Sequence, residues 1–244
     1  MREKRNTRLS GGWVALVALG FGVLVAMGIC APVAPAWADD KSDAEQLVEK
    51  ARVTLEAFVG NKEMGPALKA LLQKAKGVLI YPQVLRGAFI FGVSGGSGTL
   101  VAHDAKTKKW GGPAFYTIGE TSFGLQAGGD ASEVVLVALT ERGIASLLST
   151  SAKLGADVGV ALGPVGAGAE AATANLSADI VSYSRAKGLY AGMSVEGAVV
   201  ATRGSLNKAY YGKEVSPTDI LIRRTVSNPQ AAGLIEALTK AGGK

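Results

Sequence analysis

The chain has 244 residues, of which 26 are basic, 20 are acidic and 48% are hydrophobic. It contains one cysteine, Cys30, and one histidine, His103. A single cysteine excludes an intramolecular disulfide. With only one cysteine and one histidine, a transition-metal site built from thiolates and imidazoles is not expected. The length suffices for one domain with a substantial hydrophobic core.

The first 38 residues are typical of an export signal. Basic residues come first, namely Arg2, Lys4, Arg5 and Arg8. An uncharged stretch follows, and its apolar centre ends before the small-x-small pattern Ala36-Trp37-Ala38. This arrangement predicts a cleavable signal peptide. We expect residues 1–38 to be the signal peptide and residues 39–244 to be one folded domain of a periplasmic or secreted protein.

Two other fates of this segment stay open. The apolar run from Trp13 to Ile29 falls slightly short of the ~20 residues of a comfortable membrane-spanning helix, and an uncleaved run would attach the protein to the envelope membrane. Cys30 is a candidate for lipid attachment, although Ile29 rather than a small residue precedes it. Removing residues 1–38 takes away four basic residues and one acidic residue. The remaining 22 basic and 19 acidic residues give a charge near +3.

Two amphipathic helices are predicted at the start of the domain. The first begins near Lys41, because Ser42 and Glu45 have the spacing of a capping box. The second extends from Pro66, a favourable first helical residue, to Lys76. We expect the apolar stripes of both helices to pack on the core. The alternative is that these stripes insert into a membrane surface.

The chain after Gly77 has the pattern of a sheet, because short apolar runs alternate with glycine-rich turns. The run Val134–Leu139 is apolar at every position and is expected to be a central strand. A short helix is expected over Glu141–Thr150, whereas residues 155–174 are too rich in glycine and alanine to assign.

Helical patterns return at Ser205–Tyr211 and at Pro229–Lys240, the second with Asn228 as its cap. The predicted fold class is therefore α+β, a single domain with a glycine-rich antiparallel or mixed sheet and amphipathic helices at both ends. Residues 189–202 alternate between apolar and polar and predict one half-buried strand, although Gly192 and Gly197 interrupt it.

Several sequences match catalytic motifs but lack the surrounding features that those motifs require. Residues 92–96 match G-x-S-x-G around Ser94, but the following residues predict a strand and not the helix that a nucleophile elbow needs. Ser184 and Lys187 form S-x-x-K without the companion motifs of that enzyme class. A catalytic pair of carboxylates stays an open alternative, because the sequence spacing gives no reason to choose any two of them. The candidates are Asp130, Glu133, Asp157, Glu170, Asp179 and Glu196. We expect no enzyme activity, catalytic residue, metal or cofactor.

Charge placement indicates a surface for anions. The stretch from Met64 to His103 has no acidic residue, and Lys69, Gln73 and Lys76 are expected to share one helical face. Basic residues near an anionic bilayer contribute about 1 kcal/mol each. An ordinary solvated helix face is the alternative. The candidate lipid-binding residues are Lys69, Lys74, Lys76, Arg86 and Arg185. Few aromatic residues are interleaved with these cations, so nucleic acid is not an expected partner.

The order of three segments resembles the SYLF domain, a lipid-binding family of bacteria and eukaryotes. These segments are residues 75–104, residues 110–130 and the pair SYSRAKGLYAGMSVEG and NKAYYG, which end at Gly197 and Gly212. The resemblance covers about Asp43 to Arg223. It implies binding of phosphoinositides or other anionic lipids, with contact at an N-terminal amphipathic helix that matches Lys62–Lys76. Some eukaryotic members bind actin, and the family carries no established catalytic residues.

Together these observations predict an exported domain, of the bacterial kind, that binds anionic phospholipid at a membrane surface without catalysis. The alternative is a structural or protein-interaction module of the envelope that docks a protein partner without lipid specificity.

Overall fold

The computed structural model describes residues 36–88, 91–123, 128–166, 168–173, 177–186, 189–190 and 195–243. These residues belong to one compact unit that begins at Ala36. All but the last three residues of the expected signal peptide lie outside the described ranges, and its role stays a prediction. Within those ranges no helix is both long enough and apolar enough to cross a bilayer.

The described strands form one nine-stranded sheet. They are β1 (Gly77–Ala88), β2 (Phe91–Asp104), β3 (Lys109–Phe123), β4 (Gly128–Ala138), β5 (Ser151–Lys153), β6 (Val160–Leu162), β7 (Ile180–Ala186), β8 (Leu189–Tyr190) and β9 (Val199–Thr202). Their order is β5-β9-β3-β2-β1-β4-β7-β6, and β8 pairs with β7. All neighbouring strands are antiparallel except β6 and β7. The predicted mixed sheet is confirmed.

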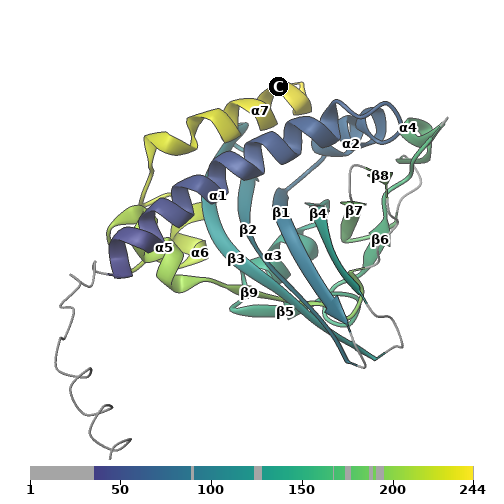
Figure 1. The fold of residues 1–244 in the computed structure, drawn as a ribbon. Coiled ribbons are helices and arrows are strands. Elements are labelled where there is room, and N and C mark those ends of the chain that lie inside the picture. The colour runs from purple at the N-terminus through teal and green to yellow at the C-terminus, as the bar shows by residue number, and fades with distance from the viewer. Residues whose placement is uncertain are drawn as a thin grey trace, which may run out of the picture. The chain divides into compact units, whose positions relative to one another are not determined.

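Helices precede, interrupt and follow the sheet. They are α1 (Ala36–Val59), α2 (Gly65–Leu72), α3 (Glu141–Leu148), α4 (Ala169–Ala172), α5 (Gly204–Tyr211), α6 (Pro217–Leu221) and α7 (Ala232–Gly242), with a 3₁₀ turn, η2 (Pro229–Ala231), before α7. Figure 1 shows α1, in purple, and α7, in yellow, side by side across one face of the sheet. The α+β class with helices at both ends is confirmed.

The first helix begins earlier than predicted. It starts at Ala36, and no glycine or proline between there and Ser42 interrupts it. Ser42 therefore lies inside the helix, where its Oγ accepts a hydrogen bond from Gln46 Nε2 at 3.1 Å. The prediction that Ser42 caps the helix is wrong. The apolar stripe is confirmed, since Ala44, Val48, Ala51, Leu55 and Phe58 are all buried in the core.

The second helix is shorter than predicted. It ends at Leu72, and Gln73 caps its C-terminus. The next residues turn toward the sheet, where the backbone N–H of Lys76 donates to the carbonyl oxygen of Ala138 at 2.8 Å. A helical Lys76 would lose this bond. The entry of the chain into the central sheet thus ends the helix before Lys74.

Both faces of the central strands are buried. On β1, Val78 and Ile80 face the core under α1, whereas Leu79 and Tyr81 belong to a second core on the opposite face. The β4 run from Val134 to Val137 alternates in the same way. These apolar side chains pack against α1, α2, α5 and α7 on one face, and near α3 and α6 on the other. The prediction that Val134–Leu139 forms a central strand is confirmed.

Residues 189–202 do not form one strand, and that prediction is wrong. Leu189–Tyr190 pairs with β7, whereas Val199–Thr202 pairs with β3 and β5 near the other end of the sheet. Between them Gly197 adopts φ = +92°, a conformation that favours glycine. The glycine that interrupts the pattern thus lies in the connection between two separate strands. Gly192 is outside the described residues.

A methyl group at Gly98 tests the packing of the central sheet. An added Cβ would lie 2.5 Å from both the Ile80 carbonyl oxygen and Tyr81 Cδ1. We expect Gly98→Ala to lower the free energy of unfolding by about 1–3 kcal/mol, measured by urea denaturation. The control is Gly204→Ala in α5, where nothing lies within 4 Å of the added Cβ. Equal stability of the two variants would contradict the close approach of β1 to Gly98.

Candidate ligand-binding surface

Three lysines lie on α2 or in the turns at its two ends, and we call this part of the domain the α2 corner. Lys62 lies in the turn between α1 and α2, Lys69 lies on α2, and Lys74 lies in the turn that follows it. All three side chains are exposed, and none forms an ion pair with another residue that the structure describes. Glu63 is the one acidic residue between Lys62 and His103. The corner is therefore a small, positively charged surface.

The apolar face of α2 is not free to enter a membrane. Its buried side chains are Ala67, Leu68, Leu71 and Leu72, each with 1% or less of its surface exposed. They pack into the core beneath α1 and α7. This confirms that the stripe is a packing surface. Any attraction of the folded α2 corner to a bilayer therefore arises from its charge.

Two other predicted cations are neutralised by residues distant in sequence. Lys76 Nζ lies 2.7 Å from Glu141 Oε1 at the start of α3, and Arg86 Nη2 lies 3.5 Å from Glu120 Oε2 on β3. Because α2 ends at Leu72, Lys69 and Lys76 share no helical face, and that prediction is wrong. The stretch without acidic residues is thus partly compensated by carboxylates that the fold brings to it.

Arg185 joins α1, β4 and β7. It lies opposite Glu133 in the strand register, and its Nε donates to Glu133 Oε2 at 2.6 Å. Its guanidinium carbon also lies 5.3 Å from the centre of the Phe58 ring. Thr54 completes the cluster by donating to Glu133 Oε1 at 3.2 Å. Of the five predicted lipid-binding residues, the fold leaves Lys69 and Lys74 exposed without an ion pair to a described residue, and it places the other three in ion pairs. The lipid role of all five stays a prediction.

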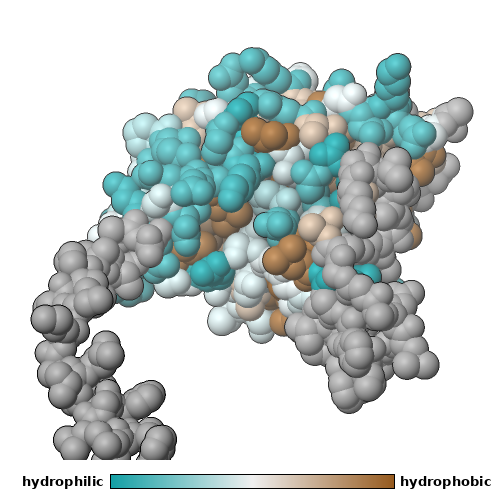
Figure 2. All heavy atoms as spheres, in the orientation of Figure 1, coloured by the Kyte–Doolittle hydropathy of each residue, from teal (hydrophilic) through white to brown (hydrophobic). Residues whose placement is uncertain are grey.

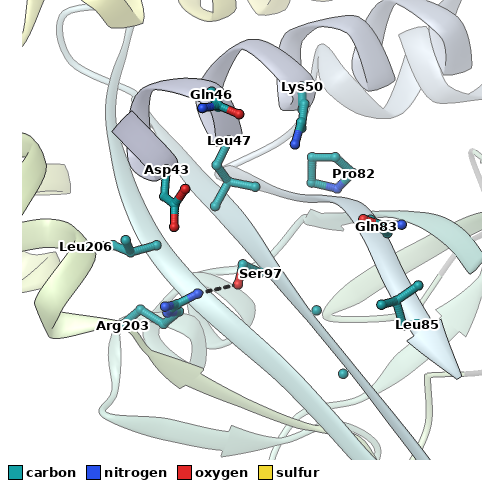
Figure 3. Close-up of a pocket in the computed structure, with 12 residues that line it drawn as sticks. Asp43, Gln46, Leu47, Lys50, Pro82, Gln83, Leu85, Ser97, Arg203 and Leu206 are labelled. Carbon is teal, nitrogen blue, oxygen red and sulfur yellow. Dashed lines mark hydrogen bonds between the residues drawn. The ribbon is translucent and has the colours of Figure 1, made fainter. Parts of the chain in front are cut away.

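A groove of about 260 Å³ lies between α1 and the sheet (Figure 3). It is lined by Asp43, Gln46, Leu47 and Lys50 of α1, Pro82, Gln83 and Leu85 of β1, Gly95, Gly96 and Ser97 of β2, and Arg203 and Leu206. Arg203 Nη1 donates to Ser97 Oγ at 2.5 Å. Neither Arg203 nor Lys50 is in an ion pair with any residue of the described part of the chain. The groove thus contains two cations without a carboxylate partner.

The backbone holds Arg203 firmly at the end of β9. Its N–H donates to the Phe115 carbonyl oxygen at 2.8 Å, and its own carbonyl oxygen accepts from Asn207 N–H at 3.1 Å. Asn207 in turn accepts from the Phe115 N–H at 2.9 Å through its buried Oδ1. Sequence reasoning missed Arg203. In the sequence Arg203 is marked only by its position between a predicted strand and a predicted helix. That position does not indicate which charges surround its side chain.

The residues of the apparent catalytic motifs lie in ordinary structural settings. Ser94 is in the middle of β2, opposite Arg86 on one side and Glu120 on the other, and the strand continues to Asp104. The strand expected after Ser94 is confirmed. The His103 ring packs edge-on against Trp110 at 5.0 Å. Lys187 is outside the described residues. Within those residues no three or more His, Cys, Asp or Glu side chains are placed to hold a metal ion.

Asp179 is a structural carboxylate. Thr140 Oγ1 donates to Asp179 Oδ1 at 2.6 Å, and the Gly159 N–H donates to Oδ2 at 3.2 Å. These hydrogen bonds, the first above all, hold the pKa of Asp179 below its usual value, with a smaller contribution from the charge of Arg142. The Thr140 hydroxyl also accepts from the Gly143 N–H as the N-cap of α3. Asp179 therefore fastens the start of α3 to the chain before β6.

The fold and its surfaces define a helix-covered α+β domain with exposed lysines at the α2 corner and a groove beneath α1. The model of the family described as "Ysc84: Las17-binding protein actin regulator" matches residues 119–241, half of the chain. The chain belongs to this family. This membership confirms the resemblance to the SYLF domain.

Three curated proteins that are similar to this chain come from eukaryotes. Protein YSC84 of Saccharomyces cerevisiae is 32% identical over 199 residues, which cover 78% of this chain and 42% of the relative. The human SH3 domain-containing YSC84-like protein 1 is 31% identical over 69% of this chain and 49% of its own length. LAS seventeen-binding protein 3 of Saccharomyces cerevisiae is 29% identical over 87% of this chain and 46% of the relative. The chain thus spans less than half the length of these relatives.

The cluster around Arg185 is testable by removing its carboxylate. We expect Glu133→Gln to lower the free energy of unfolding by about 1–3 kcal/mol, because it leaves a half-buried guanidinium without its counter-charge. The control is Glu236→Gln in α7, which removes an exposed, solvent-screened ion pair with Lys240 and should change the stability much less. Urea denaturation at neutral pH measures both, and a Glu133→Gln effect no larger than the control contradicts the cluster's structural role.

Asp179 predicts a specific acid sensitivity. Because its pKa is lower in the folded than in the unfolded state, its contribution is full above the unfolded pKa and is lost as pH falls through the folded one. We expect the stability difference between wild type and Asp179→Asn to be largest at neutral pH and to shrink toward pH ~2–3. Urea denaturation across this pH series measures it. A difference that stays constant with pH would exclude this linkage.

Proposed function

We propose that this chain is a non-enzymatic binding domain that associates with anionic phospholipid at a membrane surface through the α2 corner. The observation that carries the proposal is the group of three exposed lysines, Lys62, Lys69 and Lys74, which have no ion-pair partner among the described residues. In Figure 2 hydrophilic residues dominate the outward surface along α1, and apolar surface appears below it in separate areas.

The chemistry of the corner favours peripheral, electrostatic association. Each lysine near an anionic surface contributes about 1 kcal/mol, so three together give binding that salt weakens strongly. The apolar side of α2 is occupied by the core, and deep insertion would require this helix to unpack. Headgroups of phosphatidylglycerol or cardiolipin supply the required charge. The family's lipid-binding members support the same assignment.

We further propose that the domain works outside the cytoplasm, in the periplasm or at the envelope membrane. The support for this location is the pattern of residues 1–38, in which basic residues, an apolar run and a small-x-small sequence follow one another. In that compartment bacterial anionic lipids are the available ligands.

Protein binding is the second candidate function. One relative is named LAS seventeen-binding protein 3, and the matched family is described as a Las17-binding protein and actin regulator. This chain offers an exposed apolar edge at β6, where Leu162 is 47% exposed and Val165 beyond it is 37% exposed. An envelope protein is the partner that fits the proposed location. This function predicts a stable crosslinked complex without a preference for anionic lipid.

Sedimentation with vesicles tests the lipid proposal. The full chain is mixed with phosphatidylcholine vesicles, with or without phosphatidylglycerol, at low and at high salt. We expect sedimentation with the anionic vesicles at low salt only, and Lys69→Glu with Lys74→Glu to weaken it on the order of tenfold or more. Sedimentation with the neutral vesicles measures any attachment through the apolar run in residues 1–38, which does not depend on lipid charge.

A charge-matched control separates the corner from net charge. Lys106→Glu with Lys213→Glu changes the same total charge at two exposed lysines elsewhere on the domain, and should weaken vesicle binding far less. Equal sedimentation with both kinds of vesicle would contradict the lipid proposal. Equal loss in both double variants would exclude the α2 corner as the contact surface.

A further inference from the structure

The groove beneath α1 presents a set of hydrogen-bond donors that converge on one space. Figure 3 shows Arg203 and Ser97 on the sheet side and Lys50 on α1 above them. Ser97 Oγ accepts a hydrogen bond from Arg203 and keeps its own hydroxyl hydrogen for another acceptor. A guanidinium, an ammonium and a hydroxyl are the donors that proteins use to bind a phosphate group.

No carboxylate that the structure describes lies within 4 Å of either cation of this groove. Other half-buried arginines of the domain, such as Arg185 and Arg86, have a carboxylate within 4 Å. Arg203 has only the neutral Ser97 hydroxyl as its side-chain partner among the described residues, and Lys50 has no ion pair there. A half-buried cation without a counter-ion is unfavourable, so the groove favours an anion from outside.

Apolar surface adjoins these donors. Leu47 and Leu206 line the groove beside Arg203, and Leu85 at its other end is 55% exposed. A second hollow of about 360 Å³ shares Lys50, Pro82 and Gln83 with the first and is bordered by Val53, itself 51% exposed. Glu49 and Glu133 also line the second hollow, so its apolar surface is the part around Val53 and Pro82. A ligand with an anionic head and an apolar chain would contact the cations of the groove and this apolar part.

We propose that Arg203, Lys50 and Ser97 bind the phosphate of one anionic phospholipid molecule, whose acyl chain lies along Leu85 toward Val53. This inference rests on the proposed lipid function, but it assigns a second site, apart from the α2 corner, that recognises a single molecule. The corner attracts the domain to the bilayer, and the groove holds one lipid.

Asp43 limits the affinity of this site. It lines the same groove, and Figure 3 shows its carboxylate on the Arg203 side of the groove. No described cation lies within 4 Å of it. Its negative charge therefore repels a bound phosphate. Removal of this charge strengthens anion binding if the phosphate lies beside Arg203.

A soluble short-chain lipid isolates the groove from the bilayer. The full chain is titrated by isothermal calorimetry with dihexanoyl phosphatidylglycerol below its critical micelle concentration, and separately with dihexanoyl phosphatidylcholine and with inorganic phosphate. We expect one molecule of phosphatidylglycerol to bind per chain, more tightly than either of the other two. Inorganic phosphate that binds as tightly as the lipid would overturn the assignment of an amphiphile.

Charge variants locate the bound molecule. Arg203→Gln should weaken phosphatidylglycerol binding about tenfold or more, and the exposed Lys50→Gln about threefold. Asp43→Asn should strengthen binding. The control Lys213→Gln removes an exposed cation elsewhere and should leave binding unchanged. Circular dichroism and urea denaturation check that each variant is folded, and the exposed Lys50 and Asp43 variants test the site without disturbing the core.

The two proposals fail in different ways. In one outcome the domain still sediments with anionic vesicles, but the Arg203, Lys50 and Asp43 variants bind the short-chain lipid as the wild type does. This outcome contradicts the groove site and leaves the proposed function standing. In another outcome the short-chain lipid binds in a way that depends on Arg203, but the domain shows no preference for anionic vesicles. This outcome contradicts only the proposed membrane association through the α2 corner. Absence of both kinds of binding overturns both.

Discussion

Burial of both faces of β1 and β4 is the constraint on which the rest of the domain depends. A strand with two apolar faces needs a cover on each side, and here α1 with α7 covers one face while α3, α6 and the chain around Leu154 and Val195 cover the other. The N-terminal and C-terminal helices must therefore meet. The groove beneath α1 forms where this cover passes over the interrupted β1–β2 pairing near Pro82.

The same packing determines which cations are available. Ion pairs across the fold neutralise Arg185, Arg86 and Lys76, because β4, β3 and α3 bring carboxylates to them. Lys69 and Lys74 remain exposed on the α2 corner, and Arg203 remains in the groove with a hydroxyl partner. A surface of several lysines attracts a bilayer without selecting a molecule, whereas a shaped groove with a fixed arginine selects one. We propose that the domain uses both kinds of surface.

Much of the fold could be predicted from short stretches of the sequence. The apolar stripe of α1, the central strand at Val134–Leu139 and the Asn228 cap before α7 follow from side-chain periodicity and capping chemistry. The short helix α6 was missed, although Ser216 and Asp219 form a capping box that could have shown it. Helix ends were predicted less well. The end of α2 depends on a backbone hydrogen bond between Lys76 and Ala138, a partner 62 residues away.

By itself the sequence determined the α+β class, the family and the absence of acidic residues between Met64 and His103, because each is a property of neighbouring residues or of their order. Only the tertiary structure decided which cations keep their charge unpaired and that residues 189–202 divide between two distant parts of one sheet. The physical reason is that ion pairing and strand pairing act through space. Arg203 illustrates this most clearly, since its neighbours in the groove, Ser97 and Lys50, are about one hundred residues or more away in the chain.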